Sequence, residues 1–291
     1  MITLNQRQGV TKRNIPAFEI AVTGFAVIII TLVILIYQEE KTIDLENSSD
    51  LIAENIPDDS TMVEIAPPIL RFEESPIVEG AEFFEKSPVI EGQQAYIAFP
   101  LEVSHDSPVI LVVYSHGSNT HITANMEEVF MQDMRKYGEH FTNRGYAFAA
   151  SEQHGVNWGN ADSVQDIINL INWIKSDYPI AEKVDLIGFS MGGLPTINFA
   201  VEYPNLIDKI ALLAPTTRSD LSQANIDVLS NIEIKIWHGN KDVNIPLSST
   251  ESFVQLAGSY GKSIELIVLE GKAHFDLDTE YMEDICAFFE K

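Results

Sequence analysis

Residues 184–193 read Val-Asp-Leu-Ile-Gly-Phe-Ser-Met-Gly-Gly, with Ser190 between two glycines, after a short apolar run and before a helix-prone stretch. A serine hydroxyl is a poor nucleophile unless a base takes its proton and the chain holds it away from its own backbone. A sharp turn from strand to helix does this, and Gly188 and Gly192 supply the space that such a turn needs. The stretch predicts a nucleophilic serine, provided that the chain also supplies a base, an acid and an oxyanion site.

The rest of the chain predicts an α/β fold. From about residue 108 onward, continuous apolar runs alternate with amphipathic segments, which is typical of a mostly parallel sheet with helices on both faces. The expected strands are 94–100, 109–114, 146–150, 184–188, 207–214, 232–238 and 264–269. The expected helices are 126–144, 163–175, 191–203, 249–260 and 279–290. Functional residues are then expected at the carboxyl ends of the strands.

Two polar residues meet that expectation. Asp242 follows the strand at 232–238, and His274 follows the strand at 264–269 on a loop that contains Gly271. The chain order of nucleophile, acid and base is Ser190, Asp242, His274, and it differs from the other two common orders in serine hydrolases. We therefore expect His274 to be the base and Asp242 the acid that orients its ring.

An oxyanion site is expected after the strand at 109–114. His116, Gly117 and Ser118 follow this strand, in a turn where main-chain N–H groups can meet a carbonyl oxygen that becomes negative. The expected donors are the N–H groups of Ser118 and of Met191. His116 and Gly117 are expected to support the loop.

The other aromatic and histidine residues have weaker signals. His154 and Trp158 lie past the strand at 146–150, and together with Phe189 they are candidate pocket residues, although aromatic residues in such folds more often belong to the core. The remaining histidines are expected to be surface or structural residues, namely His105, His121, His140 and His238.

The motifs together resemble the α/β-hydrolase superfamily over about residues 80–291. They are Gly-Phe-Ser-Met-Gly-Gly at 188–193, His-Gly at 116–117, Gly-Asn-Lys-Asp-Val-Asn-Ile-Pro at 239–246 and Gly-Lys-Ala-His at 271–274. The resemblance implies a sheet of about eight strands and a Ser-His-Asp mechanism of the serine esterase or lipase type, without a metal or an organic cofactor. The segment 215–231, where many lipases insert a lid, is too short for a large cap domain.

Charge excludes one class of partner. The chain carries a formal net charge of −25, all of it beyond residue 37, because residues 1–37 hold Arg7, Lys12 and Arg13 against Glu19. A strongly acidic surface repels phosphate backbones, so no nucleic-acid partner is expected.

The N-terminal region predicts a membrane anchor. Residues 20–37 carry no charge and would span about 27 Å as a helix, close to the thickness of the hydrocarbon core of a bilayer. The basic residues before this span predict a cytoplasmic N-terminus at 1–15, an anchor at 16–37, an acidic linker at 38–75 and an extracytoplasmic catalytic domain at 76–291. A cleaved signal peptide and a secreted enzyme are the alternative.

Three functions stay open. The leading hypothesis is a membrane-anchored hydrolase of small-molecule or lipid esters, acting through an acyl-enzyme on Ser190. The same three residues would also support a peptidase or amidase. A hydrolase fold kept as an inert binding domain is the third reading, because a fold alone does not establish a function.

Overall fold

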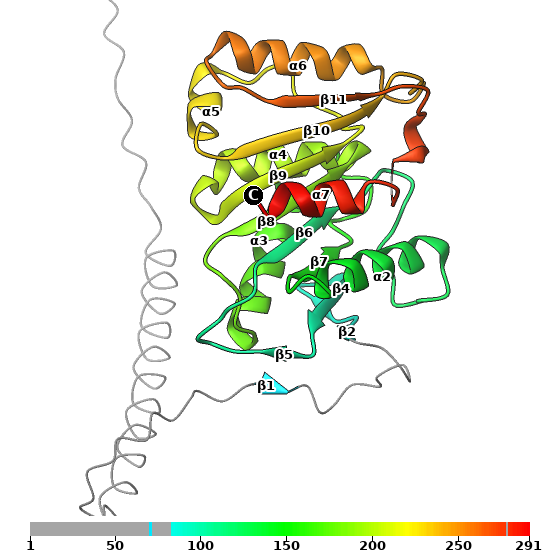
Figure 1. The fold of residues 1–291 in the computed structure, drawn as a ribbon, viewed down its shortest axis with the longest axis vertical. Helices are drawn as coiled ribbons and strands as arrows, with labels where there is room; N and C mark the ends of the chain where they lie inside the picture. The colour runs from blue at the N-terminus through cyan, green and yellow to red at the C-terminus, as the bar shows by residue number, and fades with distance from the viewer. Residues whose placement is uncertain (1–69, 72–82, 278) are drawn as a thin grey trace, which may run out of the picture. The chain divides into compact units, whose positions relative to one another are not determined.

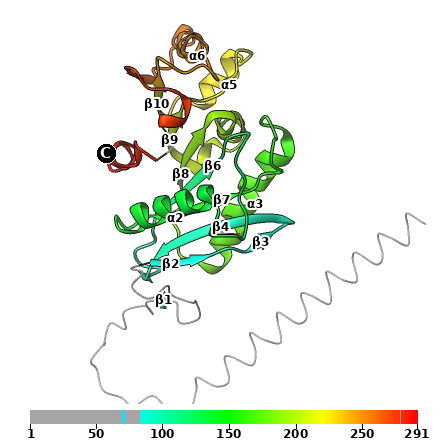
Figure 2. The ribbon, with the colours of Figure 1, turned by 90° about the vertical axis from the view of Figure 1, so that its right-hand side faces the viewer.

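A twisted sheet of nine strands organises the computed structural model, which describes residues 70–71, 83–277 and 279–291 (Figures 1 and 2). Six neighbouring strands are parallel, in the order β11 (Glu265–Leu269), β10 (Glu233–Gly239), β9 (Ile207–Leu213), β8 (Val184–Phe189), β6 (Leu111–Ser115) and β7 (Ala147–Ser151). An antiparallel edge follows, made of β4 (Gln93–Pro100), β2 (Phe83–Lys86) and β3 (Val89–Ile90), which pairs with β4. The carboxyl ends of the six parallel strands therefore meet at one edge.

Helices cover both faces of this sheet. Buried side chains of α2 (Val129–Thr142) and α7 (Met282–Phe289) pack on one face. Those of α3 (Ala161–Asp177), α4 (Gly193–Glu202), α5 (Gln223–Val228) and α6 (Leu247–Ser259) pack on the other. Figure 2 shows α2 and α3 on opposite sides of the sheet.

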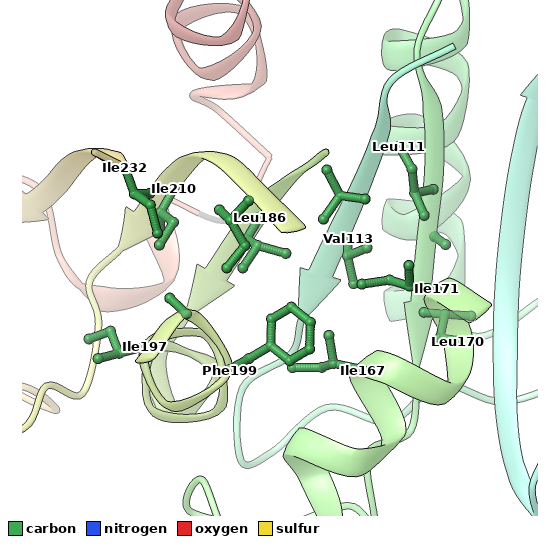
Figure 3. Packing of buried hydrophobic residues seen from close by; sticks show 14 of the residues in the cluster. Leu111, Val113, Ile167, Leu170, Ile171, Leu186, Ile197, Phe199, Ile210 and Ile232 are labelled. Atoms are coloured by element: carbon green, nitrogen blue, oxygen red, sulfur yellow. The ribbon is translucent and has the colours of Figure 1, made fainter. Parts of the chain in front are cut away.

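The alternation of side chains along each strand builds two cores. In β6, Leu111 and Val113 join the core under α3 and α4, whereas Val112 and Tyr114 join the core under α2. Figure 3 shows Leu111 and Val113 beside Ile167 and Ile171 of α3. The central strands β6, β7 and β8 are buried on both faces and are largely apolar, and this is the reason that the sequence indicates a parallel sheet.

The predicted α/β fold is confirmed, with local differences. The helix expected from residue 126 begins at Val129, because 122–128 form a loop whose backbone bonds include Glu128 N–H to Asn125 O at 3.1 Å. The sheet is mixed rather than parallel at its β4–β2 edge. Between β9 and β10 the structure has loops and the short helix α5, which leaves no large cap domain in this connection.

The expected anchor at 16–37 and most of the linker at 38–75 lie outside the described residues. Within this range only Leu70–Arg71 is described, as the strand β1, which pairs antiparallel with β5 (Glu102–Val103). Among the helices that the structure does describe, none is long and apolar enough to cross a bilayer.

Candidate active site

Ser190 lies at the carboxyl end of β8, in the turn that leads into α4. The turn is a short 3₁₀ segment, Ser190–Gly192, and Ser190 has a φ of 53°. Non-glycine residues rarely adopt this left-handed conformation, which costs on the order of 1–3 kcal/mol and persists only where the surroundings enforce it. A β-carbon on Gly188 would lie 2.8 Å from the Gly192 carbonyl oxygen, so the turn requires glycine there.

His274 contacts Ser190 directly. It begins the 3₁₀ segment η3 (His274–Asp276) after β11, and its Nε2 lies 2.8 Å from the Ser190 Oγ. Its Nδ1 lies 2.7 Å from the Asp242 Oδ2. A carboxylate only accepts hydrogen bonds, so Nδ1 carries the hydrogen and Nε2 is left to accept the serine proton. The three side chains form one hydrogen-bonded series.

Asp242 is held by the backbone of its own loop. Its Oδ1 accepts the N–H groups of Asn244 and Ile245, each at 2.8 Å, which leaves Oδ2 for His274. Ser190, Asp242 and His274 are each less than one tenth exposed. A carboxylate that is held in place and shielded from solvent can orient the imidazole and stabilise its charged form.

His238 is a second histidine beside Asp242, which the sequence assigned only to the surface or structural class. It is fully buried at the end of β10, and its Nε2 lies 3.3 Å from the Asp242 Oδ2 and 2.9 Å from the Ile245 carbonyl oxygen. Its Nδ1 lies 2.9 Å from the Thr250 hydroxyl. Burial lowers the pKa of His238, so this ring stays neutral near pH 7 and donates from Nε2.

The loop after β6 lies against the nucleophile turn. Ser115 at the end of β6 pairs with Gly188 of β8, so His116, Gly117 and Ser118 begin beside the turn that holds Ser190. A β-carbon on Gly117 would lie 3.2 Å from the Phe189 ring. Both ring nitrogens of His116 contact carbonyl oxygens at 2.8 Å, those of Gly117 and Glu152. The two expected oxyanion donors, Ser118 and Met191, thus belong to adjoining segments.

The three candidate pocket residues have different surroundings. Phe189 is buried, and its ring centroid lies 5.2 Å from that of His274, so it packs against the histidine. The His154 Nδ1 lies 2.6 Å from the Oδ2 of the buried Asp166, and the backbone N–H of His154 donates to the Gln93 Oε1. Burial raises the pKa of Asp166. Trp158 is 55% exposed. Of the three, Trp158 presents the most surface to a ligand.

The site contains no recognisable set of metal ligands. In the part of the chain that the structure describes, no three His, Cys, Asp or Glu side chains cluster as a metal ion would require. The groups that the structure brings together are a hydroxyl, an imidazole and a carboxylate, the set used for nucleophilic acyl transfer.

Comparisons with known proteins agree with the α/β fold. A model of the Hydrolase_4 family, described as serine aminopeptidase, S33, matches residues 106–232. The fold is similar to that of a thermostable esterase, with a TM-score of 0.54 and 17% identity over 72% of this chain and 63% of the esterase. The chain has the α/β-hydrolase fold, and over residues 106–232 it is similar to the Hydrolase_4 family.

Other α/β-hydrolases with similar structures have different activities. S-formylglutathione hydrolase from Staphylococcus aureus has a TM-score of 0.57 and 14% identity over 72% of this chain and 96% of its own. Acylaminoacyl peptidase from Pyrococcus horikoshii has a TM-score of 0.56 and 13% identity over 73% of this chain, which spans only 41% of the peptidase. No curated protein matches the chain. At these identities the structures establish the α/β-hydrolase fold of this chain and not its substrate.

Proposed function

We propose that this α/β-hydrolase is a serine hydrolase that cleaves carboxylic esters through an acyl-enzyme on Ser190. The observation that carries the proposal is the hydrogen-bonded series from Ser190 Oγ to His274 Nε2 and from His274 Nδ1 to Asp242 Oδ2. The strained backbone of Ser190 supports it, because strain of this kind is maintained where a function needs it.

The proposed reaction has two stages. His274 Nε2 takes the proton of Ser190 as Oγ attacks the ester carbonyl, and the N–H groups of Ser118 and Met191 stabilise the oxyanion of the tetrahedral intermediate. His274 then gives the proton to the leaving alkoxide, which departs as the alcohol. Water, deprotonated by the same Nε2, attacks the acyl-enzyme, and His274 returns the proton to the Ser190 Oγ as the carboxylic acid leaves.

Labelling with a fluorophosphonate probe tests the proposal. Wild type should lose its ester hydrolysis as the probe forms one adduct, which mass spectrometry should locate on Ser190. Ser190→Ala should take no probe, and Ser248→Ala, on the exposed surface of α6, should behave as wild type. Intact wild type that neither reacts with the probe nor hydrolyses any ester would leave the inert binding domain as the better reading.

Amide hydrolysis is the second candidate, because the matching family model is described as a serine aminopeptidase. An amide leaving group needs protonation more than an alkoxide does, so the two activities separate kinetically. A p-nitrophenyl ester and a p-nitroanilide with the same acyl group are the matched pair. A kcat/KM for the anilide equal to or above that for the ester would favour the peptidase.

We further propose that residues 16–37 anchor the enzyme in a membrane, with residues 1–15 cytoplasmic and the catalytic domain outside. The uncharged run at 20–37 and the basic residues before it support this topology. The full chain should remain with membranes after carbonate extraction, and its catalytic domain should be digested by protease added outside intact cells. Release of an active, shortened protein into the medium would favour signal cleavage instead.

A further inference from the structure

Glu152, the first residue after β7, contacts the loop after β6 with both its carboxylate and its backbone. The carboxylate accepts the Ile122 N–H at Oε2 and the His121 Nδ1–H at Oε1, both at 2.6 Å. The backbone carbonyl oxygen of Glu152 accepts from the His116 Nε2 at 2.8 Å. These contacts lie at the two ends of the loop 116–122, so Glu152 ties both ends of the loop to β7.

Apart from the contact of the His116 Nδ1 with the Gly117 carbonyl oxygen at 2.8 Å, the hydrogen bonds inside this loop are longer. Thr120 N–H lies 3.4 Å from the Gly117 carbonyl oxygen, and its hydroxyl lies 3.1 Å from the same atom. Residues 116–122 contain no helix or strand. Loops without a hydrogen-bond ladder take their conformation from the groups that they contact, and here Glu152 supplies the shortest contacts.

His116 lies between two backbone carbonyl oxygens. Its Nδ1 faces the Gly117 carbonyl oxygen and its Nε2 faces the Glu152 carbonyl oxygen. The buried ring therefore bridges the first residues of the loop after β6 to the end of β7. The Glu152 Oε2 also lies 4.0 Å from the His116 Nε2.

We propose that Glu152 is a positioning residue for ester hydrolysis. It holds the loop after β6, residues 116–122, through His116, His121 and Ile122. The inference rests on the proposed serine hydrolase function and deepens it. The expected donor on this loop, the Ser118 N–H, is a main-chain group that every substitution except proline leaves in place. Substitution of Glu152 is therefore a way to change the placement of the Ser118 N–H.

The position of an oxyanion donor matters more in the transition state than in the bound substrate, because the negative charge develops only as the bond forms. Loosening the loop should therefore lower kcat and leave KM nearly unchanged. Removing one donor outright costs about 10²–10³ in rate, and a displaced donor should cost less, about 10- to 100-fold.

Kinetics of Glu152→Ala and Glu152→Gln test the proposal, with Glu251→Ala on the exposed surface of α6 as the control. Glu152→Ala should lower kcat about 10- to 100-fold with KM within about threefold, and should weaken binding of a trifluoromethyl ketone by the same factor as kcat/KM falls. Glu152→Gln should recover part of the rate, because its amide oxygen can still accept one N–H. Glu251→Ala should match wild type.

Two outcomes would overturn the role of Glu152. One is a folded Glu152→Ala protein, assayed well below its thermal midpoint, with the kcat of wild type. The other is a rise in KM alone, which would indicate substrate binding rather than positioning. Wild type that fails to react with the fluorophosphonate would instead remove the proposed function itself, so the two failures are distinct.

Discussion

Ser115 and Gly192 approach so closely that a β-carbon on Gly192 would lie 2.0 Å from the Ser115 carbonyl oxygen. This contact joins the end of β6 to the turn that holds Ser190, and it sets the distance between the loop after β6 and the nucleophile. No side chain larger than hydrogen fits between them.

Gly192→Ala should therefore push the nucleophile turn away from β6. We expect kcat for an ester to fall by at least about 100-fold, because shifts of about 1 Å in an active site have effects of this size. The matched control is Gly258→Ala in α6, where a β-carbon would meet nothing within 4 Å. This control should keep full activity and gain up to about 1 kcal/mol of stability. Full activity in Gly192→Ala would show that the contact has no role.

Asp242→Asn should separate the orientation of His274 from the folding of its loop. Asparagine can keep accepting the Asn244 and Ile245 N–H groups through its oxygen, so the thermal midpoint should change little. The loss of the negative charge beside Nδ1 should lower kcat by about 10³- to 10⁴-fold. Asp106→Asn, on an exposed loop, is the control. Unchanged kcat in Asp242→Asn would assign the orienting role to another group.

His154→Ala should affect stability more than turnover. The substitution removes the only hydrogen bond described for the buried Asp166 carboxylate, a loss of about 1–3 kcal/mol in the free energy of unfolding. Urea unfolding would measure this loss, with the exposed His105→Ala as the control. A large rise in KM that depends on the acyl chain, with stability unchanged, would instead assign His154 to the substrate pocket.

Asp185 should make stability depend on pH. It is buried at the start of β8, and burial, with a smaller effect from the nearby Asp208, raises its pKa to about 7. In the unfolded chain the carboxyl group ionises near pH 4, so from about pH 4 to pH 7 the folded protein holds a proton that the unfolded chain has lost. The contribution of Asp185 to stability should therefore be complete below pH 4 and be lost as the pH rises to about 7.

Asp185→Asn should remove this dependence, because asparagine does not ionise and can still accept the Lys209 N–H that Asp185 accepts at 3.0 Å. Urea unfolding of both proteins between pH 4.5 and pH 8 would measure the difference. The variant should become progressively more stable than wild type as the pH rises. Parallel curves for the two proteins would contradict the raised pKa.

The sequence alone predicts the site residues whose placement depends on their position at the end of a strand. Ser190, Asp242 and His274 each follow an apolar run, and parallel strands bring such positions to one edge, where the structure places them within hydrogen-bond distance. The fold followed from the same alternation of apolar runs and amphipathic segments.

The supporting residues depend on which strands are neighbours, and a single sequence does not state this. Glu152 reaches the loop after β6 only because β7 pairs with β6. His238 lies among apolar residues of β10, and nothing in that pattern distinguishes a histidine that contacts Asp242 from one in a core. For both Glu152 and His238, the sequence signal that was available is a polar residue at the end of a buried strand.

The pairing of β9 with β10, from Lys209 opposite Glu233 to Leu213 opposite Trp237, divides the site in two. Ser190 and the loop after β6 come before β9 in the chain, whereas Asp242 and His274 come after β10. A chain cut in the connection 215–231 would leave the hydroxyl on one fragment and its base and acid on the other. Ester hydrolysis would then require the two fragments to associate, and each fragment alone would be inactive.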